Sequence, residues 1–238
     1  MNQTNKTAVI TGGSQGIGRA VSEKFLQQGW QVAICARTDA SLQEVLTTWK
    51  KEFPNATILA MPVDLSKADE VAHFATAILK QFTTVDVLVN NAGLFFPGTL
   101  AEEPEGHLEQ LMAVNVYSAY HLTRQLLPQM KAHQIGHIFN MCSVASLRAY
   151  DNGGAYSITK YALLGFSDNL RKELMPFQIK VTAVMPGATW SRSWAASGVE
   201  KERMMLPEDI AALIWNATQL SANANVDHIV IRPLKGDI

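Results

Sequence analysis

Short β-rich apolar runs alternate with amphipathic segments of helical length along nearly the whole 238-residue chain. Several runs, such as Val87–Val89 and Val181–Val184, are continuously apolar, which is typical of strands covered on both faces. The alternation predicts an α/β fold with a doubly wound, mostly parallel seven-stranded sheet and helices on both faces. No linker, low-complexity tract or internal repeat divides the chain, so we expect residues 1–238 to form a single domain.

The boundaries of these elements follow from where the periodicity changes. The expected strands are Thr7–Thr11, Gln31–Ala36, Thr57–Pro62, Asp86–Asn90, Gly136–Cys142, Lys180–Met185 and His228–Arg232. The expected helices are Gly16–Gln28, Asp39–Glu52, Lys67–Gln81, Gly106–Ala132, Gly154–Met175 and Pro207–Leu220.

Composition excludes several classes of protein. A hydrophobic fraction of 47% and a charged fraction of 17% are those of an ordinary globular protein, and a net charge of −1 recruits neither nucleic acid nor anionic membrane. No apolar run is long enough to span a membrane, and from the polar start we expect no signal sequence. Cys35 and Cys142 lie in apolar runs and are expected to be buried thiols in a reducing cytoplasm. The six histidines lack ligand spacing, so no metal site is expected.

A glycine-rich stretch, Thr11–Gly18, falls between the first strand and the first helix. Its glycines, at positions 12, 13, 16 and 18, do not follow the G-x-G-x-x-G fingerprint. Such glycines nevertheless let the backbone approach a pyrophosphate bound at the positive N-terminus of a helix. The alternative is a glycine-rich turn without a ligand, but the position after the first strand favours dinucleotide binding.

The end of the second strand bears on the choice of cofactor. Ala36 supplies no carboxylate to repel a ribose 2′-phosphate, and Arg37 offers that phosphate a charge-assisted fork. Asp39 could instead bind the ribose of NAD, or cap the second helix. Surface arginines at strand ends are also common. The pattern favours NADP(H) over NAD(H).

The third and fourth strands also end in residues suited to a ligand crevice. Asp64 could meet the adenine end of a nucleotide, while Ser66 is the expected cap of the next helix. The small residues of Asn90–Gly93 leave room for a ligand at the carboxyl end of a central strand. The apolar loop that follows, Leu94–Pro97, is either a substrate wall or simple packing.

Tyr156 and Lys160 are four positions apart, so on a helix they lie on one face, one turn apart. An ammonium beside a phenol should lower the tyrosine pKa from its usual value of about 10 and yield a proton donor usable near neutral pH. Asn115 lies within an apolar tract, where a buried amide needs partners. It could bond backbone carbonyls at a kink or hold a water in a proton relay, and by itself the residue favours the structural role.

A segment at about 188–206, which follows the sixth strand, lies where a lid over the crevice would be expected. Its tryptophans, Trp190 and Trp194, either pack the lid onto the domain or stack on a planar substrate. The helix at 154–175 is apolar on more than one face, which makes self-association plausible.

Together these residues resemble the short-chain dehydrogenase/reductase superfamily over nearly the whole chain. The matching motifs are TGxxxGxG at Thr11, Gly12, Gly16 and Gly18, NNAG at Asn90–Gly93, an asparagine at Asn115, a serine at Ser143, YxxxK at Tyr156 and Lys160, and a PG turn with a threonine at Pro186, Gly187 and Thr189. The 13-position gap between the serine and the tyrosine is usual for the family. Gln15 is a departure, because many members that use NADP carry a basic residue there; the cofactor preference therefore depends on Arg37.

The resemblance implies a Rossmann-type single domain, a nicotinamide cofactor and, commonly, a homodimer or homotetramer. It assigns the proton donor to Tyr156, the lowering of that pKa and a ribose contact to Lys160, a carbonyl contact to Ser143 and a relay water to Asn115. Expected cofactor contacts are Gly12, Ser14, Gln15, Gly16, Ile17, Gly18, Arg37, Thr38, Asp64, Leu65, Asn91, Ala92, Gly93, Tyr156, Lys160, Pro186, Gly187 and Thr189. Phe96 and Trp194 are the expected substrate contacts.

A finer resemblance covers the C-terminal part. Met204–Ala211, Ile231–Pro233 and the ending Gly236–Ile238 are similar to bacterial sepiapterin-reductase-like members, as is Trp194 in the corresponding lid. The resulting hypothesis is an NADP(H)-dependent oxidoreductase that reversibly reduces a ketone or aldehyde carbonyl, with sepiapterin-like or broader carbonyl substrates. The alternatives are a 3-oxoacyl-type reductase, whose usual glycine-rich ending is absent here, and a non-catalytic NADP-binding sensor or scaffold.

Overall fold

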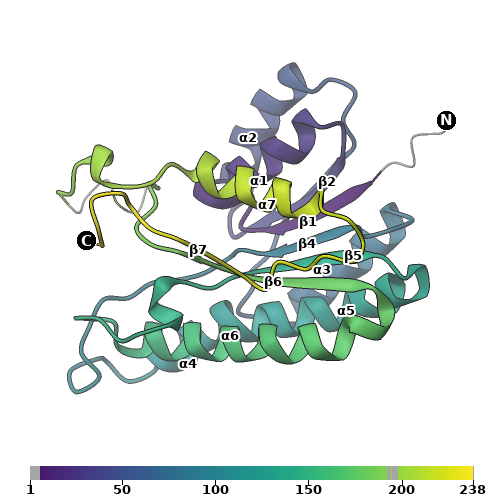
Figure 1. The fold of residues 1–238 in the computed structure, drawn as a ribbon. Coiled ribbons are helices and arrows are strands. Elements are labelled where there is room, and N and C mark those ends of the chain that lie inside the picture. Colours follow the sequence, from purple (N-terminus) through teal and green to yellow (C-terminus); the bar gives the residue numbers. More distant parts are fainter. Residues whose placement is uncertain (1–5, 192–193, 195–197, 238) are drawn as a thin grey trace.

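Seven strands lie side by side in one sheet in the computed structural model, which describes residues 6–191, 194 and 198–237 (Figure 1). Their order is β3-β2-β1-β4-β5-β6-β7, and each pairs with its neighbours in parallel. The strands are β1 (Thr7–Thr11), β2 (Gln31–Ala36), β3 (Ile58–Pro62), β4 (Val87–Asn90), β5 (Gly136–Met141), β6 (Ile179–Pro186) and β7 (His228–Ile231). The predicted seven-stranded Rossmann-type sheet is confirmed, with strand ends shifted by at most one residue.

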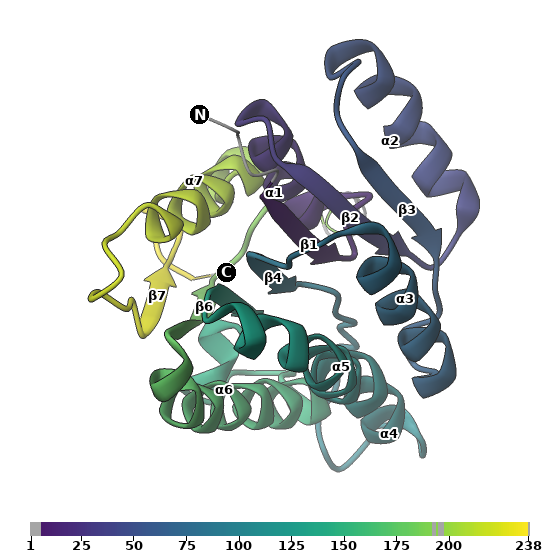
Figure 2. The ribbon, with the colours of Figure 1, turned by 90° about the vertical axis from the view of Figure 1, so that its right-hand side faces the viewer.

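Helices cover both faces of the sheet, as Figure 2 shows. The first face carries α1 (Gly16–Gln27), α2 (Asp39–Glu52) and α7 (Pro207–Thr218), and the second carries α3 (Ala68–Gln81), α5 (Ser118–His133) and α6 (Gly154–Leu174). Each face has its own apolar core, centred on Phe25 and Trp49 in the first case and on Phe74 and Leu126 in the second. The doubly wound arrangement is therefore confirmed.

The continuously apolar strands are explained by this layering. Alternate residues of a strand point to opposite faces, so in β4 Val87 and Val89 join the first core and Leu88 joins the second. All three side chains are at most 1% exposed. Such a strand has no polar face, which is why the sequence shows an unbroken apolar run.

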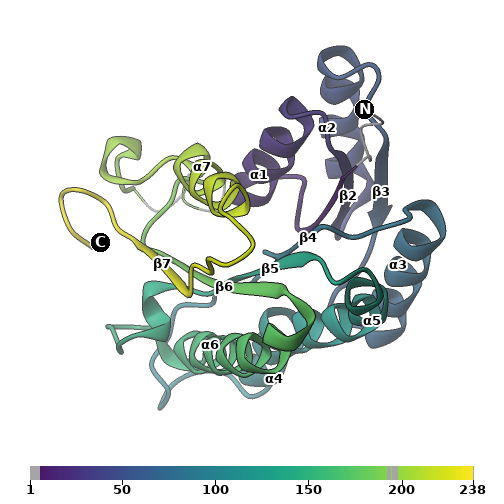
Figure 3. The same cartoon turned by 45° about the vertical axis from the view of Figure 1, so that its right-hand side comes forward.

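The carboxyl ends of the parallel strands all meet at one edge of the sheet, on the left in Figure 1 and again visible in Figure 3. Strand order reverses between β1 and β4, which start crossovers to opposite faces. In open α/β sheets, ligands bind at the carboxyl edge beside such a reversal. The segments that follow β1, β4, β5 and β6 meet there.

A chain of buried side-chain amides and hydroxyls joins the strands behind this edge to the helices of the second face. The Asn90 amide donates to Asn140 Oδ1 at 2.8 Å and to Thr123 Oγ1 at 3.0 Å, and the Asn140 amide donates to Ser167 Oγ at 2.8 Å. Polar groups buried in a core are acceptable when they bond one another in this way. These hydrogen bonds hold β4 and β5 in fixed positions against α5 and α6.

Local differences from the predictions occur at helix starts and in the long predicted helix 106–132. That segment contains α4 (His107–Met112), a π-helical turn (Ala113–Tyr117) and α5, and such π turns are frequent at functional sites. Neither Ser66 nor Asp39 is a helix cap. Ser66 instead donates to Asp64 Oδ1, and Asp39 is the first residue of α2.

Candidate active site

Ser143 lies at the carboxyl edge of the sheet, two residues after β5 ends. It caps a short 3₁₀ helix (Val144–Ser146), with its Oγ accepting a hydrogen bond from the Ala145 N–H at 3.1 Å. Ser146 Oγ in turn accepts from the Ser143 N–H and donates to the carbonyl of Lys160 at 2.8 Å. The serine is therefore fixed both to its own turn and to helix α6.

Helix α6 brings Tyr156 and Lys160 to Ser143. The Lys160 Nζ lies 5.5 Å from the centre of the Tyr156 ring and donates to the Met141 carbonyl, at the end of β5, over 2.7 Å. The Tyr156 side chain is hydrogen-bonded to that of Ser143. The predicted grouping of serine, tyrosine and lysine is present in the structure.

The predicted lowering of the tyrosine pKa is wrong, because the pKa of Tyr156 is raised. Burial raises the pKa of Tyr156 to about 12, and this outweighs the opposing effect of the hydrogen bond with Ser143. Burial also lowers the pKa of Lys160 to about 8, because an ammonium is costly to desolvate. The lysine directs its proton to the Met141 carbonyl, so the sequence spacing alone overestimated its influence on the phenol.

Asn115, on the π-helical turn, holds the segment that follows β4. Its Oδ1 accepts from the Leu94 N–H at 2.7 Å, and its amide donates to the Leu94 carbonyl and to Thr159 Oγ1, both at 3.0 Å. A Cβ added to Gly93 would lie 3.3 Å from Asn115 Oδ1 and 3.6 Å from Lys160 Nζ. These contacts support the structural interpretation and also place the amide beside the lysine, where the relay role stays a prediction.

The glycine-rich loop packs tightly against the segment after β4. Asn91 donates from its side chain to the Thr11 carbonyl at 2.8 Å, and its backbone N–H donates to Thr11 Oγ1 at 2.9 Å. Gly12 has a φ of +66°, and a Cβ on Gly18 would collide with the Gly12 carbonyl and the Asn91 amide. Only glycines fit here, and the two predicted cofactor segments form one surface.

Other predicted cofactor residues are distributed around this surface. Arg37 follows β2 on the exposed edge, and the Ser14 and Thr38 hydroxyls both bond Ser41 Oγ. Hydrogen bonds from Ser66 lower the pKa of Asp64. Gln15 precedes α1, and Gly16 is its first residue. Ile17 packs against the apolar core of the first face, and Leu65 belongs to the core of the second. The Ala92 N–H donates to Thr11 Oγ1.

The PG turn and the predicted lid border the same edge on the β6 side. Pro186 ends β6, the Gly187 N–H donates to the Ile231 carbonyl at 2.8 Å, and Thr189 Oγ1 donates to the Gly187 carbonyl at 3.0 Å. Thr189 pairs with Met205, which closes the base of the lid. Within it, the Trp194 N–H donates to the Ser191 carbonyl; residues 192–193 and 195–197 of the predicted lid lie outside the described residues.

The two phenylalanines of the apolar loop after β4 lie in different surroundings, and the substrate contact of Phe96 stays a prediction. Phe96 packs against His107, with ring centres 4.8 Å apart. The Phe95 ring meets that of Tyr156 edge to face, with 4.9 Å between centres, and Phe95 is 48% exposed. The spacing of an apolar loop could not tell which of the two neighbouring rings would point to the site.

Comparison with known proteins identifies the family to which the chain belongs. The family model for short chain dehydrogenase matches residues 6–201. The chain belongs to the short-chain dehydrogenase family. It is 30% identical to a sepiapterin reductase of Chlorobaculum tepidum, with 97% of each chain covered.

Two solved structures with bound nucleotides are also similar. One is an alcohol dehydrogenase from Thermococcus sibiricus complexed with 5-hydroxy-NADP, at 27% identity and a TM-score of 0.88, covering 96% of this chain and 97% of the other. The second is L-sorbose reductase from Gluconobacter frateurii complexed with NADPH and L-sorbose, at 26% identity and a TM-score of 0.89, covering 97% and 96%. Among the described residues, no group of three or more metal-ligating side chains gathers.

Sequence reasoning missed Glu103 in this short-chain dehydrogenase. Its Oε1 accepts from the Ala155 N–H at 2.8 Å, in the first turn of α6 and next to Tyr156. Gly98 and Gly154 leave room for the carboxylate, since a Cβ on Gly154 would collide with it. A carboxylate is favourable at the positive end of a helix. Only the Gly153–Gly154 pair hinted at such a close approach.

Replacement of Glu103 by alanine should therefore destabilise the protein. The change removes a cap of α6, and lost caps typically cost about 1 kcal/mol. Glu102→Ala is the matched control, because Glu102 is exposed and bonds the Thr99 hydroxyl. Urea unfolding should show a lower free energy of unfolding for Glu103→Ala than for Glu102→Ala; equal values would contradict the capping role.

Proposed function

We propose that this short-chain dehydrogenase is an NADP(H)-dependent carbonyl reductase that converts a ketone or aldehyde to an alcohol, reversibly. The observation that carries the proposal is the contact among Ser143, Tyr156 and Lys160 beside the surface formed by the glycine loop and Asn91. One domain would then hold both the cofactor and the substrate.

The chain's residues fit a dinucleotide phosphate. The start of α1 offers N–H groups and the positive end of a helix, and Gly12, Gly16 and Gly18 keep side chains out of the way. Ala36 carries no carboxylate, and Arg37 is exposed to meet a 2′-phosphate. Gly93 and Gly187 border the far end, near Lys160 and the lid. When bound, NADPH supplies the hydride for the carbonyl carbon.

Tyr156 and Ser143 supply the proton chemistry. With a pKa of about 12, Tyr156 holds its proton across the physiological range, so it is a donor ready for an oxygen that gains negative charge. Ser143, bonded to the phenol, is placed to share that oxygen and to stabilise the developing charge. Lys160 holds the end of β5 and adds positive charge to the same site.

The finer substrate assignment rests on aromatic side chains and on similarity. Phe95 packs against Tyr156 and is exposed, and Trp194 belongs to the lid. These two aromatic rings are available to pack against a planar substrate. The similarity to a protein named sepiapterin reductase supports a carbonyl on a planar heterobicycle. A 3-oxoacyl-type substrate is the competing proposal, and a sensor without catalysis is the competing function.

We further propose a cytoplasmic homo-oligomer. Tyr117, Tyr120, Ile158 and Tyr161 are each at least 40% exposed and lie on α5, α6 and the π-helical turn between α4 and α5. An apolar face of this kind suits a second copy of the chain. The buried free thiols Cys35 and Cys142 are consistent with a reducing compartment. No helix in the described part of the chain is both long and apolar enough to cross a membrane.

Tyr156→Phe should lower kcat about 10²- to 10⁴-fold, the range for loss of a general acid. NADPH binding should survive, because the change removes one hydroxyl. Tyr161→Phe is the matched control, since Tyr161 lies on the same helix but is 46% exposed. The measurement is the oxidation of NADPH with a panel of ketones and aldehydes. Turnover retained in Tyr156→Phe would refute the assignment of the proton donor.

Arg37→Asp should weaken NADPH binding about ten- to a hundredfold, as expected for loss of a hydrogen bond between charged groups. The introduced carboxylate would repel the 2′-phosphate, whereas NADH lacks that group and serves as the control ligand. Fluorescence titration of both nucleotides gives the ratio of their affinities. An unchanged ratio would contradict the role of Arg37 in cofactor choice.

A further inference from the structure

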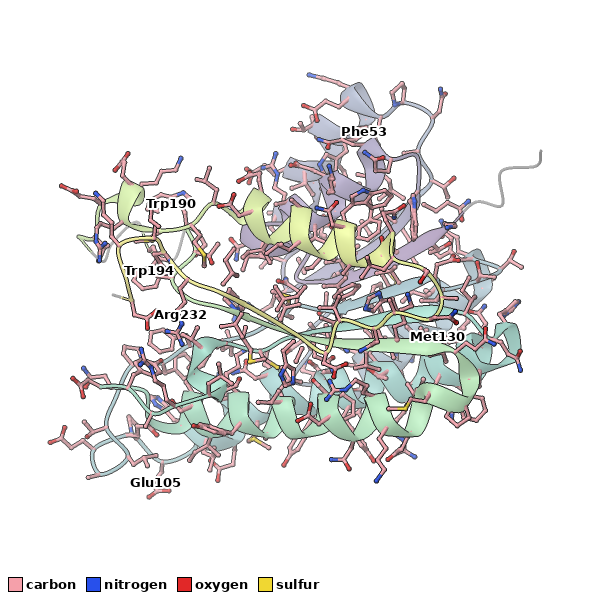
Figure 4. The ribbon with its side chains drawn as sticks, in the orientation of Figure 1. Phe53, Glu105, Met130, Trp190, Trp194 and Arg232 are labelled. Carbon is pink, nitrogen blue, oxygen red and sulfur yellow. The ribbon has the colours of Figure 1, made fainter. Side chains whose placement is uncertain are left out.

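Two arginines from distant parts of the chain converge on one carboxylate at the carboxyl edge of the sheet. Arg148 donates to Asp237 Oδ2 over 2.6 Å, and Arg232 bonds the same oxygen. Two guanidinium groups share one carboxylate, so the cluster keeps a net positive charge. Figure 4 shows Arg232 at the same edge as Trp190 and Trp194.

Strand register places this cluster beside the reaction site. Met141 of β5 pairs with Val184 of β6, and Pro186 pairs with Ile231 of β7. Ser143 and Arg148 follow the end of β5, and Arg232 follows the end of β7, so both arginines leave the sheet at its carboxyl edge, on either side of Pro186 at the end of β6.

Asp237 reaches into the same region through a tight turn of the C-terminal tail. The Gly236 N–H donates to the Pro233 carbonyl at 2.9 Å, and Gly236 has a φ of +90°, a left-handed conformation that favours glycine. A Cβ on Gly187 would lie 3.5 Å from Asp237 Oδ1. The carboxylate thus stands between the PG turn and the loop after Ser143.

The contact is open to exchange. The Arg148 side chain is 66% exposed, and those of Arg232 and Asp237 are each 32% exposed. Ion pairs in such positions contribute little to stability, because water competes for both charges. Another carboxylate held nearby by a second contact can therefore replace Asp237 on the two guanidinium groups.

We propose that Arg148 and Arg232 form a subsite for a carboxylate carried by the carbonyl substrate, and that Asp237 holds this subsite until the substrate's carboxylate takes its place. The preferred substrates are then carbonyl compounds that also carry a carboxylate several bonds from the carbonyl. This inference rests on the proposed carbonyl reductase, whose Ser143 and Tyr156 would hold the other end of the substrate.

The test compares two ketones that differ in charge, 4-acetylbenzoate and 4-acetylbenzamide, by NADPH oxidation. Arg148→Gln and Arg232→Gln should each lower the ratio of kcat/KM for the acid to that for the amide by about tenfold or more. Arg203→Gln is the matched control, because Arg203 bonds the tail at the Lys235 carbonyl but is no partner of Asp237 in the described contacts. An unchanged ratio in Arg148→Gln and Arg232→Gln would overturn the subsite.

Asp237→Asn tests whether the Asp237 carboxylate occupies the subsite and competes with the carboxylate of the substrate. Removal of the tethered competitor should raise the acid-to-amide ratio. A ratio that falls or stays the same would overturn the claim that Asp237 occupies the subsite.

If the wild-type enzyme reduces neither ketone, that result counts against the proposed carbonyl reduction of such compounds. Calorimetry then tests the subsite separately, by measuring ligand binding without turnover. Binding of 4-acetylbenzoate to the NADP⁺-loaded protein, lost in Arg148→Gln and Arg232→Gln, would still support the subsite. No binding to the wild-type protein would overturn it.

Discussion

The hydrogen bond from Lys160 to the Met141 carbonyl is the contact on which the reaction site depends. It joins the N-terminal half of α6 to the end of β5. Helix α6 carries Tyr156, and the turn after β5 carries Ser143. The Ser146 hydroxyl, bonded to the Lys160 carbonyl, makes a second tie between the same elements. With both ends fixed, the serine and tyrosine have little freedom to separate, which is the preorganisation that proton transfer requires.

Burial sets the protonation of this site. Desolvation raises the pKa of Tyr156 and lowers that of Lys160, so the pKa values of the two side chains move apart. The phenol stays protonated at neutral pH, which suits the direction of reduction. Phe95, packed edge to face on the tyrosine ring, adds to this desolvation on the side open to a substrate.

Much of the fold could be predicted because its signals are local. Continuous apolar runs gave the buried strands, and the glycines at 12, 16 and 18 marked a loop whose close packing excludes side chains. Ser143, Tyr156 and Lys160 were found through motif spacing, and the structure brings them together.

The remaining features depend on contacts between residues far apart in the sequence. Glu103 meets Ala155 and Arg148 meets Asp237 only after the sheet has ordered its strands. The direction of the tyrosine pKa depended on how deeply the pair is buried, which spacing cannot report. That Phe95 packs on Tyr156 while Phe96 packs on His107 depends on the conformation of one loop.

A crystal structure of the protein with NADP⁺ and an unreactive carbonyl compound is the most direct test of the central claim. The account predicts that the carbonyl oxygen lies within hydrogen-bond distance, about 2.5–3.0 Å, of both Ser143 Oγ and Tyr156 Oη. A carbonyl oxygen bound away from both groups, with the cofactor in place, would contradict it.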